Sequence, residues 1–379
     1  MTARTFTFTV SPPTGPSWFT ALGHKQWAAP VTNTIQSVLD PLANSTNKGL
    51  VGPSSIVTAW VGAILDQSTK DLSLFGNGGH QDYCGNEVYS VRLNVESPAW
   101  IRRRNATAAP ANDSLAHPQW ADGRPCSDHT GDYCVATPGK WFKCGLGAGN
   151  FDNCIKENYW WSFDPTANDY TFLGSGYATN PEGYAISSSV VYDPSRNQII
   201  KCIASPSSAT CIRMYSVTTA AQVDSIPVSM GSGTVLASLD TTNDVLLVRY
   251  YNSNTCLAIK LSAKAVTTFS TTGTRPTDST AKIWWHAPSN AFLTWDGAQG
   301  LLKLTPTVGG TSYTGAAWTP VAGAGGVTLP SNMVAGLSGG MYSKTQLIED
   351  MGDGTGALVI VPRWSSVSDV WVMRLTGAV

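Results

Sequence analysis

Three histidines are the residues of this chain best suited to bind a metal ion. His80, His129 and His286 each stand at the end of an expected strand, in a different part of the sequence. If those strands surround one axis, the three imidazoles could meet in a central channel and bind zinc or copper. The alternative is that each histidine hydrogen-bonds to the backbone of a turn. The sequence leaves both interpretations open but favours the second, and we expect neither a bound metal nor a cofactor.

A second group of residues has the chemistry of acid–base catalysis. His80, Asp82 and Glu87 lie close together in one expected loop, and His129 offers a further imidazole. An imidazole and a carboxylate can move protons in a hydrolase. Asp side chains also fix tight loops by bonding to their own backbone, which is the structural alternative. The chain contains no G-x-S-x-G, H-E-x-x-H or P-loop motif. The sequence therefore favours a non-enzymatic protein and leaves an enzyme open.

Aromatic and basic side chains are the candidates for ligand contacts. The chain has 14 tryptophans, which are too many to lie all in the core. Neighbours on a strand, such as Trp160 and Trp161, point to opposite faces, and an outward ring can stack on a sugar or fill a protein interface. We expect the loops 105–123 and 126–154 to be contact surfaces. The candidate binding residues are Trp120, Arg124, Trp160 and Trp284.

The composition indicates an all-β protein made of short strands and many turns. Charged residues are only 13% of the 379, while Gly and Pro number 36 and 22. Long helices and coiled coils are excluded, because they need a high content of Ala, Glu, Lys, Leu and Arg. The net charge of −1 gives no general attraction to nucleic acid. No apolar run reaches the ~18 residues of a membrane span, so we expect no membrane insertion.

The strands group into repeated units of about 45 residues, the length of one propeller blade. In each unit an apolar strand ends in a polar turn such as DPSRNQ or DTTND, and three further strands follow. Four antiparallel strands cannot bury both of their faces alone, so such units must pack around a common axis. The sequence predicts a single β-propeller of about six four-stranded blades, with seven as the alternative count.

The first two units resemble the blades of kelch and galactose-oxidase-type β-propellers. That pattern has a glycine pair at the end of the second strand, an aromatic residue in the third and a tryptophan in the fourth. The residues that carry the resemblance are Gly78-Gly79-His80, Tyr89 and Trp100 in one unit, and residues 145–150, 159–164 and Tyr170 in the next. Kelch-type motifs imply a fold and carry no chemistry of their own.

Two further segments resemble propellers encoded by tailed bacteriophages and prophages. They are the glycine-rich run 76–89 and residues 124–130, which read RPCSDHT. The resemblance implies a virion structural protein that is tail-associated and acts as an adhesion or docking module for protein or glycan. Its partners would be other virion proteins, present as multiple copies in a symmetric assembly, and a host surface glycan. The alternative function is a propeller glycan hydrolase or lyase acting in the central channel.

The chain divides into an N-terminal arm and the propeller. We expect residues 1–30 to form a strand or arm that closes the last blade, because residues 4–10 alternate polar with apolar side chains. Residues 31–379 would then form the propeller. The first residues lack the apolar stretch of a signal peptide, so we expect synthesis in the host cytoplasm and a final location in the virion.

Overall fold

The computed structural model of this chain describes most of the sequence. The described residues are 15–75, 78, 82–108, 120, 122–127, 129–145, 160–174, 188–203, 212–228, 230, 234–250, 252–278, 280–310, 312–322, 341–361 and 370–379. In these residues no helix is both long and apolar enough to cross a lipid bilayer. The predicted strand at 4–10 lies outside the described residues, as does His80.

The described structure is built from β-strands, with only short helical turns. The helical segments are α1 (Ser17–Thr20), η1 (Ile35–Val38), α2 (Ser55–Thr58), η3 (Ala287–Ser289) and η4 (Tyr342–Lys344). The first sheet contains β2 (Ile64–Asp66), β3 (Asp71–Phe75), β4 (Val88–Arg92) and β5 (Trp100–Arg104). The second contains β6 (Cys134–Thr137), β7 (Lys140–Cys144), β8 (Trp160–Asp164) and β9 (Asp169–Gly174).

The remaining sheets follow in chain order. The third contains β10 (Ser188–Asp193), β11 (Gln198–Ile203), β12 (Ile212–Ser216) and β13 (Gln222–Ile226). An eight-stranded sheet contains β14 (Val235–Asp240), β15 (Val245–Tyr250), β16 (Thr255–Lys260), β17 (Ala265–Gly273), β18 (Trp284–His286), β19 (Ala291–Asp296), β20 (Gly300–Gly309) and β21 (Ser312–Pro320). The last contains β1 (Trp27–Ala28), β22 (Thr345–Ile348), β23 (Gly356–Ile360) and β24 (Trp371–Leu375).

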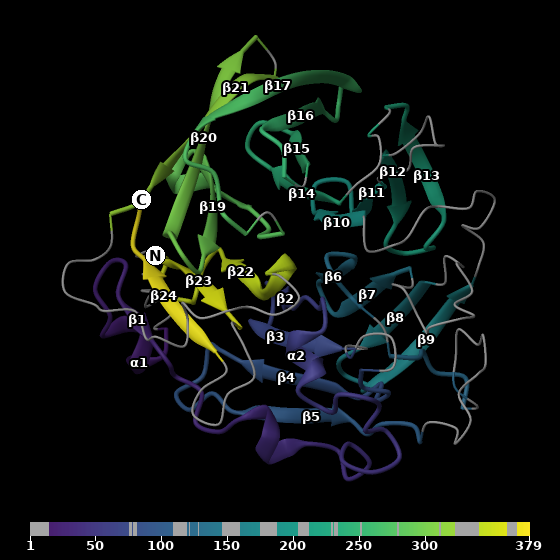
Figure 1. Ribbon diagram of the computed structural model, residues 1–379. Helices are drawn as coiled ribbons and strands as arrows, with labels where there is room; N and C mark the ends of the chain where they lie inside the picture. Colours follow the sequence, from purple (N-terminus) through teal and green to yellow (C-terminus); the bar gives the residue numbers. More distant parts are fainter. Residues whose placement is uncertain are drawn as a thin grey trace, which may run out of the picture.

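The sheets stand around a common axis in a propeller-like arrangement, which confirms the predicted all-β class (Figure 1). Strands β2, β6, β10, β14, β18 and β22 contact one another in that order, and β22 contacts β2. In the eight-stranded sheet, β17 and β21 pair in parallel, and every other neighbouring pair is antiparallel. The sheet pattern is thus four four-stranded sheets and one sheet of eight strands.

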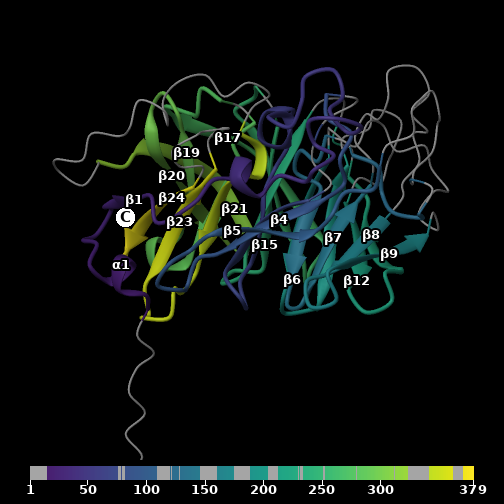
Figure 2. The same ribbon diagram turned by 90° about the horizontal axis from the view of Figure 1, so that it is seen from below.

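The last sheet takes strands from both ends of the described chain. β1 pairs antiparallel with β24, with Trp27 opposite Met373 and Ala28 opposite Val372. Seen at right angles to the first view, α1, β1 and the C-terminal end lie together on one side of the molecule (Figure 2). β1 covers the outer edge of β24, which would otherwise present unpaired backbone groups.

A repeated turn joins the first strand of a sheet to the second. Asp193 and Asp240 each accept the backbone N–H of the residue two positions later, at 2.9 and 2.8 Å. The residue four positions after each aspartate, Asn197 or Asp244, has a left-handed φ of 52° or 55°. Asn and Asp tolerate this conformation better than most residues, so the polar turn in each predicted unit has a local physical reason.

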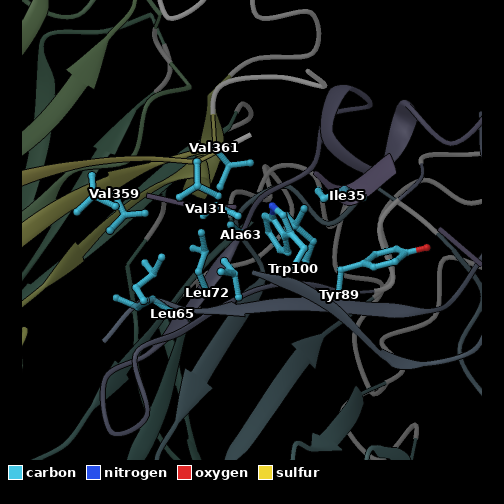
Figure 3. Packing of buried hydrophobic residues seen from close by; sticks show 14 of the residues in the cluster. Val31, Ile35, Ala63, Leu65, Leu72, Tyr89, Trp100, Val359 and Val361 are labelled. Atoms are coloured by element: carbon cyan, nitrogen blue, oxygen red, sulfur yellow. The ribbon is translucent and has the colours of Figure 1, made fainter. Parts of the chain in front are cut away.

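The core lies between neighbouring sheets rather than within any one of them. Figure 3 shows one cluster in which Leu72 of β3 and Trp100 of β5 pack with Val359 of β23. All three side chains are at most 1% exposed. Successive side chains of a strand point to opposite faces of its sheet. Because neighbouring sheets cover both faces, apolar side chains can be buried on either face.

Candidate functional site

A cavity of about 270 Å³ lies where the innermost strands meet. Each of the six strands that contact one another around the axis contributes to its wall. One apolar side chain from each strand is Ile64, Val135, Val190, Leu239, Trp284 and Leu347. Propeller-like packing therefore creates an axial cavity whose wall is assembled from segments that are far apart in the sequence.

Lys282 lines this cavity and forms a fully buried ion pair with Asp132. Its Nζ lies 2.7 Å from Oδ1 of Asp132 and also donates to the carbonyl of Val190 at 2.9 Å. The hydroxyl of Ser189 donates to the other carboxylate oxygen of Asp132. Burial raises the pKa of Asp132 to about 6 in spite of the neighbouring ammonium group. The two opposite charges neutralise each other, so the cavity acquires little net charge from this pair.

Other polar groups of the cavity wall are engaged by the protein itself. The indole N–H of Trp284 donates to the carbonyl of Thr345 at 2.7 Å. The amide nitrogen of Gln346 donates to Ala63 and that of Gln67 to Leu347, both at 2.6 Å. The ring of Trp284 also lies under the Lys282 ammonium, 4.8 Å from it. Trp284, one of the predicted binding residues, thus presents an apolar ring with its polar edge already bonded.

The structure brings together two of the predicted acid–base residues, Asp82 and His129. Oδ2 of Asp82 lies 3.6 Å from Nε2 of His129. The imidazole also packs against the ring of Trp60, with centroids 5.0 Å apart. The contribution of Trp60 was not foreseen, because it lies far from both residues in the sequence and belongs to no motif with them.

Glu87, the third described acid–base candidate, belongs to a separate buried cluster. Its Oε1 accepts hydrogen bonds from the hydroxyls of Tyr83 and Tyr89, the latter at 2.9 Å. Among the described residues, nothing hydrogen-bonds to its Oε2. Burial raises the pKa of Glu87, and this effect outweighs the hydrogen bonds from the two phenols, which lower it.

The three-histidine alternative stays a hypothesis, because His80 is outside the described residues. His286 ends β18, and its Nδ1 lies 2.6 Å from the hydroxyl of Ser289. Burial lowers the pKa of His286 to about 4, which keeps the ring neutral near pH 7. Within the described part of the chain, no three His, Cys, Asp or Glu side chains are grouped as metal ligands would be.

The other predicted binding residues lie in different surroundings. Trp120 and Trp160 are buried, at 5% and 0% exposure. Arg124 lines an open cleft of about 540 Å³ between the edges of the first two sheets. There its Nε donates to Asp169 at 2.7 Å, while Arg104 pairs with Asp122 at 3.2 Å. Of the four predicted binding residues, Trp284 and Arg124 line hollows of the molecule.

Comparison with known proteins finds similar structures but identifies no family for this chain. No protein-family model matches the sequence, and no curated protein matches it. A GH74 enzyme from Niastella koreensis matches 75% of this chain at 13% identity and a TM-score of 0.42. A structural genomics protein of unknown function from Bacteroides thetaiotaomicron matches 59% at 12% identity and a TM-score of 0.34. The chain spans about half the length of these two structures, 42% and 54% respectively.

Proposed function

We propose that this protein is a non-enzymatic binding module of a bacteriophage virion, tail-associated and used for docking or adhesion. The observation that carries the binding role is the axial cavity, whose wall is largely apolar and aromatic and in which Lys282 and Trp284 bond to the protein itself. Such a wall favours contact with another molecule over proton transfer. The phage assignment rests on the resemblance of residues 76–89 and 124–130 to phage-encoded propellers.

A count of six kelch-like blades accompanies this proposal. The eight-stranded sheet divides at the β17–β21 pair into two sets of four antiparallel strands. Together with the four smaller sheets this gives six blades, each contributing one strand to the axial ring. As part of the same proposal, the module would be present as multiple copies in a symmetric assembly, with other virion proteins and a host glycan as partners.

A glycan hydrolase or lyase is the second candidate function. The pairing of Asp82 with His129 favours it, since a carboxylate beside an imidazole is a common acid–base arrangement. Purified protein incubated with host surface glycan separates the two candidates. Release of reducing ends that is lost in Asp82→Asn would favour the enzyme, and absence of release would favour the binding module.

The location of the protein tests the virion assignment. A lysate from phage-infected cells is sedimented on a density gradient, and the fractions are blotted for this chain. We expect the chain to sediment with the particles at a fixed copy number. Chain that remains at the top of the gradient, in lysates with intact particles, would contradict the virion assignment.

A further inference from the structure

Trp60 is an exposed aromatic residue held in a conformation that its side chain disfavours. Its φ is 46°, in the left-handed region, where a bulky residue is a true outlier. The residue is also 46% exposed, so burial returns little of the conformational cost. Conformational strain of this kind persists where surrounding structure enforces it, and it gathers at ligand sites.

The backbone around Trp60 is fixed by the segment that leads into β6. Gly131 donates its N–H to the carbonyl of Trp60 at 2.9 Å, and Gly62 donates to the hydroxyl of Thr130 at 3.2 Å. A side chain on Gly62 would collide with the carbonyl oxygen of Gly131, 2.2 Å from the position of its Cβ. The close approach of these two segments therefore determines where the indole stands.

An imidazole packs against the exposed ring, and a carboxylate lies next to that imidazole. The His129 ring is tilted by 54° against the indole, and its Nε2 faces the carboxylate of Asp82. The His129 side chain is 2% exposed and the Asp82 side chain 22%. The partly exposed carboxylate of Asp82 therefore lies beside the His129 ring, which in turn packs against the exposed indole.

Two exposed apolar residues lie on the segment whose backbone bonds to Asp82. Leu50 is 70% exposed and Val51 is 58% exposed. The backbone N–H of Val51 donates to the carbonyl of Asp82 at 3.0 Å, which ties this segment to the same place. We call Leu50, Val51, Trp60, Asp82 and His129 the Trp60 corner. It combines apolar surface, one aromatic face and one partly exposed acid.

We propose that the Trp60 corner binds a neutral pyranose sugar. The apolar C–H face of the ring would stack on the indole, and hydroxyl groups at its edge would donate hydrogen bonds to Asp82. A sugar that carries a carboxylate would meet like charge at Asp82 and bind less well. This inference rests on the adhesion role proposed above and gives that role a ligand class and a site.

The test measures sugar binding to the full chain by saturation-transfer NMR. The probes are the methyl glycosides of galactose, glucose, mannose and N-acetylglucosamine, with glucuronic acid as the acidic comparison. We expect transfer to at least one neutral probe, strongest on the protons of one ring face. We expect weaker transfer to glucuronic acid. No transfer to any neutral probe, or a preference for the acid, would overturn the proposal.

Variants locate the binding at Trp60. Trp60→Asn removes the indole and keeps a residue that tolerates the left-handed conformation, so the fold is retained. We expect binding to weaken about tenfold in this variant and to be largely kept in Trp60→Phe. Phe172→Ala removes another exposed aromatic, on β9, and serves as the matched control.

The outcomes separate this site from the general function. Unchanged sugar binding in Trp60→Asn, or an equal loss in Phe172→Ala, would overturn the site. If that happened while the chain still sedimented with particles, the docking function would stand without a sugar site. Sugar binding at Trp60 by a chain absent from particles would retain the site and contradict the virion assignment.

Discussion

Asp132 and Glu87 are two fully buried carboxyl groups that the protein treats in opposite ways. Asp132 faces the ammonium group of Lys282 at 2.7 Å, so its charge has a buried partner. Glu87 faces two phenols, and none of its hydrogen bonds in the described structure comes from a cationic side chain. Burial disfavours the charge of both groups, but only Asp132 has a cation to offset that cost. The comparison teaches that burial alone does not determine whether an acid is ionised.

Exchanging Asp132 for its amide should have the largest effect on stability. Asp132→Asn leaves the Lys282 ammonium buried without an anion, so we expect a loss of about 3–5 kcal/mol in the free energy of unfolding. Urea unfolding at pH 7 measures it. The control is the double variant Asp132→Leu with Lys282→Met, which removes both charges and should recover most of the loss. A double variant as unstable as Asp132→Asn would contradict the assigned pairing.

Removing the hydroxyl that supports Asp132 should have the next largest effect. Ser189 donates to this carboxylate and accepts the backbone N–H of Ala237 at 2.8 Å. Hydrogen bonds to charged groups contribute about 1.5–3 kcal/mol, so we expect Ser189→Ala to lower stability by that amount. Ser73 is the matched control, because its buried hydroxyl has no hydrogen-bond partner among the described residues. Equal losses in Ser189→Ala and Ser73→Ala would show that the hydroxyl of Ser189 does not support a charge.

Glu87→Gln should have the smallest effect, and that effect should depend on pH. The folded-state pKa of Glu87 is raised, so its stabilising contribution is full below the unfolded pKa and is lost as pH rises through the folded pKa. Near pH 4 we expect the free energy of unfolding of the variant to lie within about 1 kcal/mol of the wild-type value. As pH rises, we expect the variant to become more stable relative to the wild type. Thermal unfolding of both proteins from pH 4 to 9 measures this. If instead the wild type became more stable relative to the variant as pH rises, Glu87 would be ionised in the folded protein.

Local sequence predicted the fold better than it predicted the site. The repeated polar turns mark strand ends because Asp193 and Asp240 each hydrogen-bond to the backbone of their own turn. Such a turn is encoded within about five consecutive residues, so a local sequence pattern is enough to predict it. The alternation in strands likewise predicted an all-β chain. The number of blades was harder to predict from the sequence. β17 pairs with β21 and joins two groups of four strands into one sheet, and no local sequence pattern indicates this pairing.

The contacts of the candidate sites join residues far apart in the chain, which explains why spacing could not reveal them. Lys282 pairs with Asp132 across 150 positions, and no motif links the two. Alternation along β8 predicts opposite faces for Trp160 and Trp161 and so one outward ring, yet both rings are 0% exposed. Neighbouring sheets cover both faces of β8, and a single sequence does not show which sheets become neighbours.

The pairing of β1 with β24 has a consequence for the order of folding. Trp27 meets its partner Met373 only after all the residues between them have been synthesised. The sheets between them have neighbouring strands along the chain and can form as they emerge, whereas the last sheet must wait. Contacts of such long sequence separation form slowly, because the chain loses much conformational entropy before they are made. Until then the outer edge of β24 is open, so a slow final phase that completes this sheet is the step most exposed to aggregation.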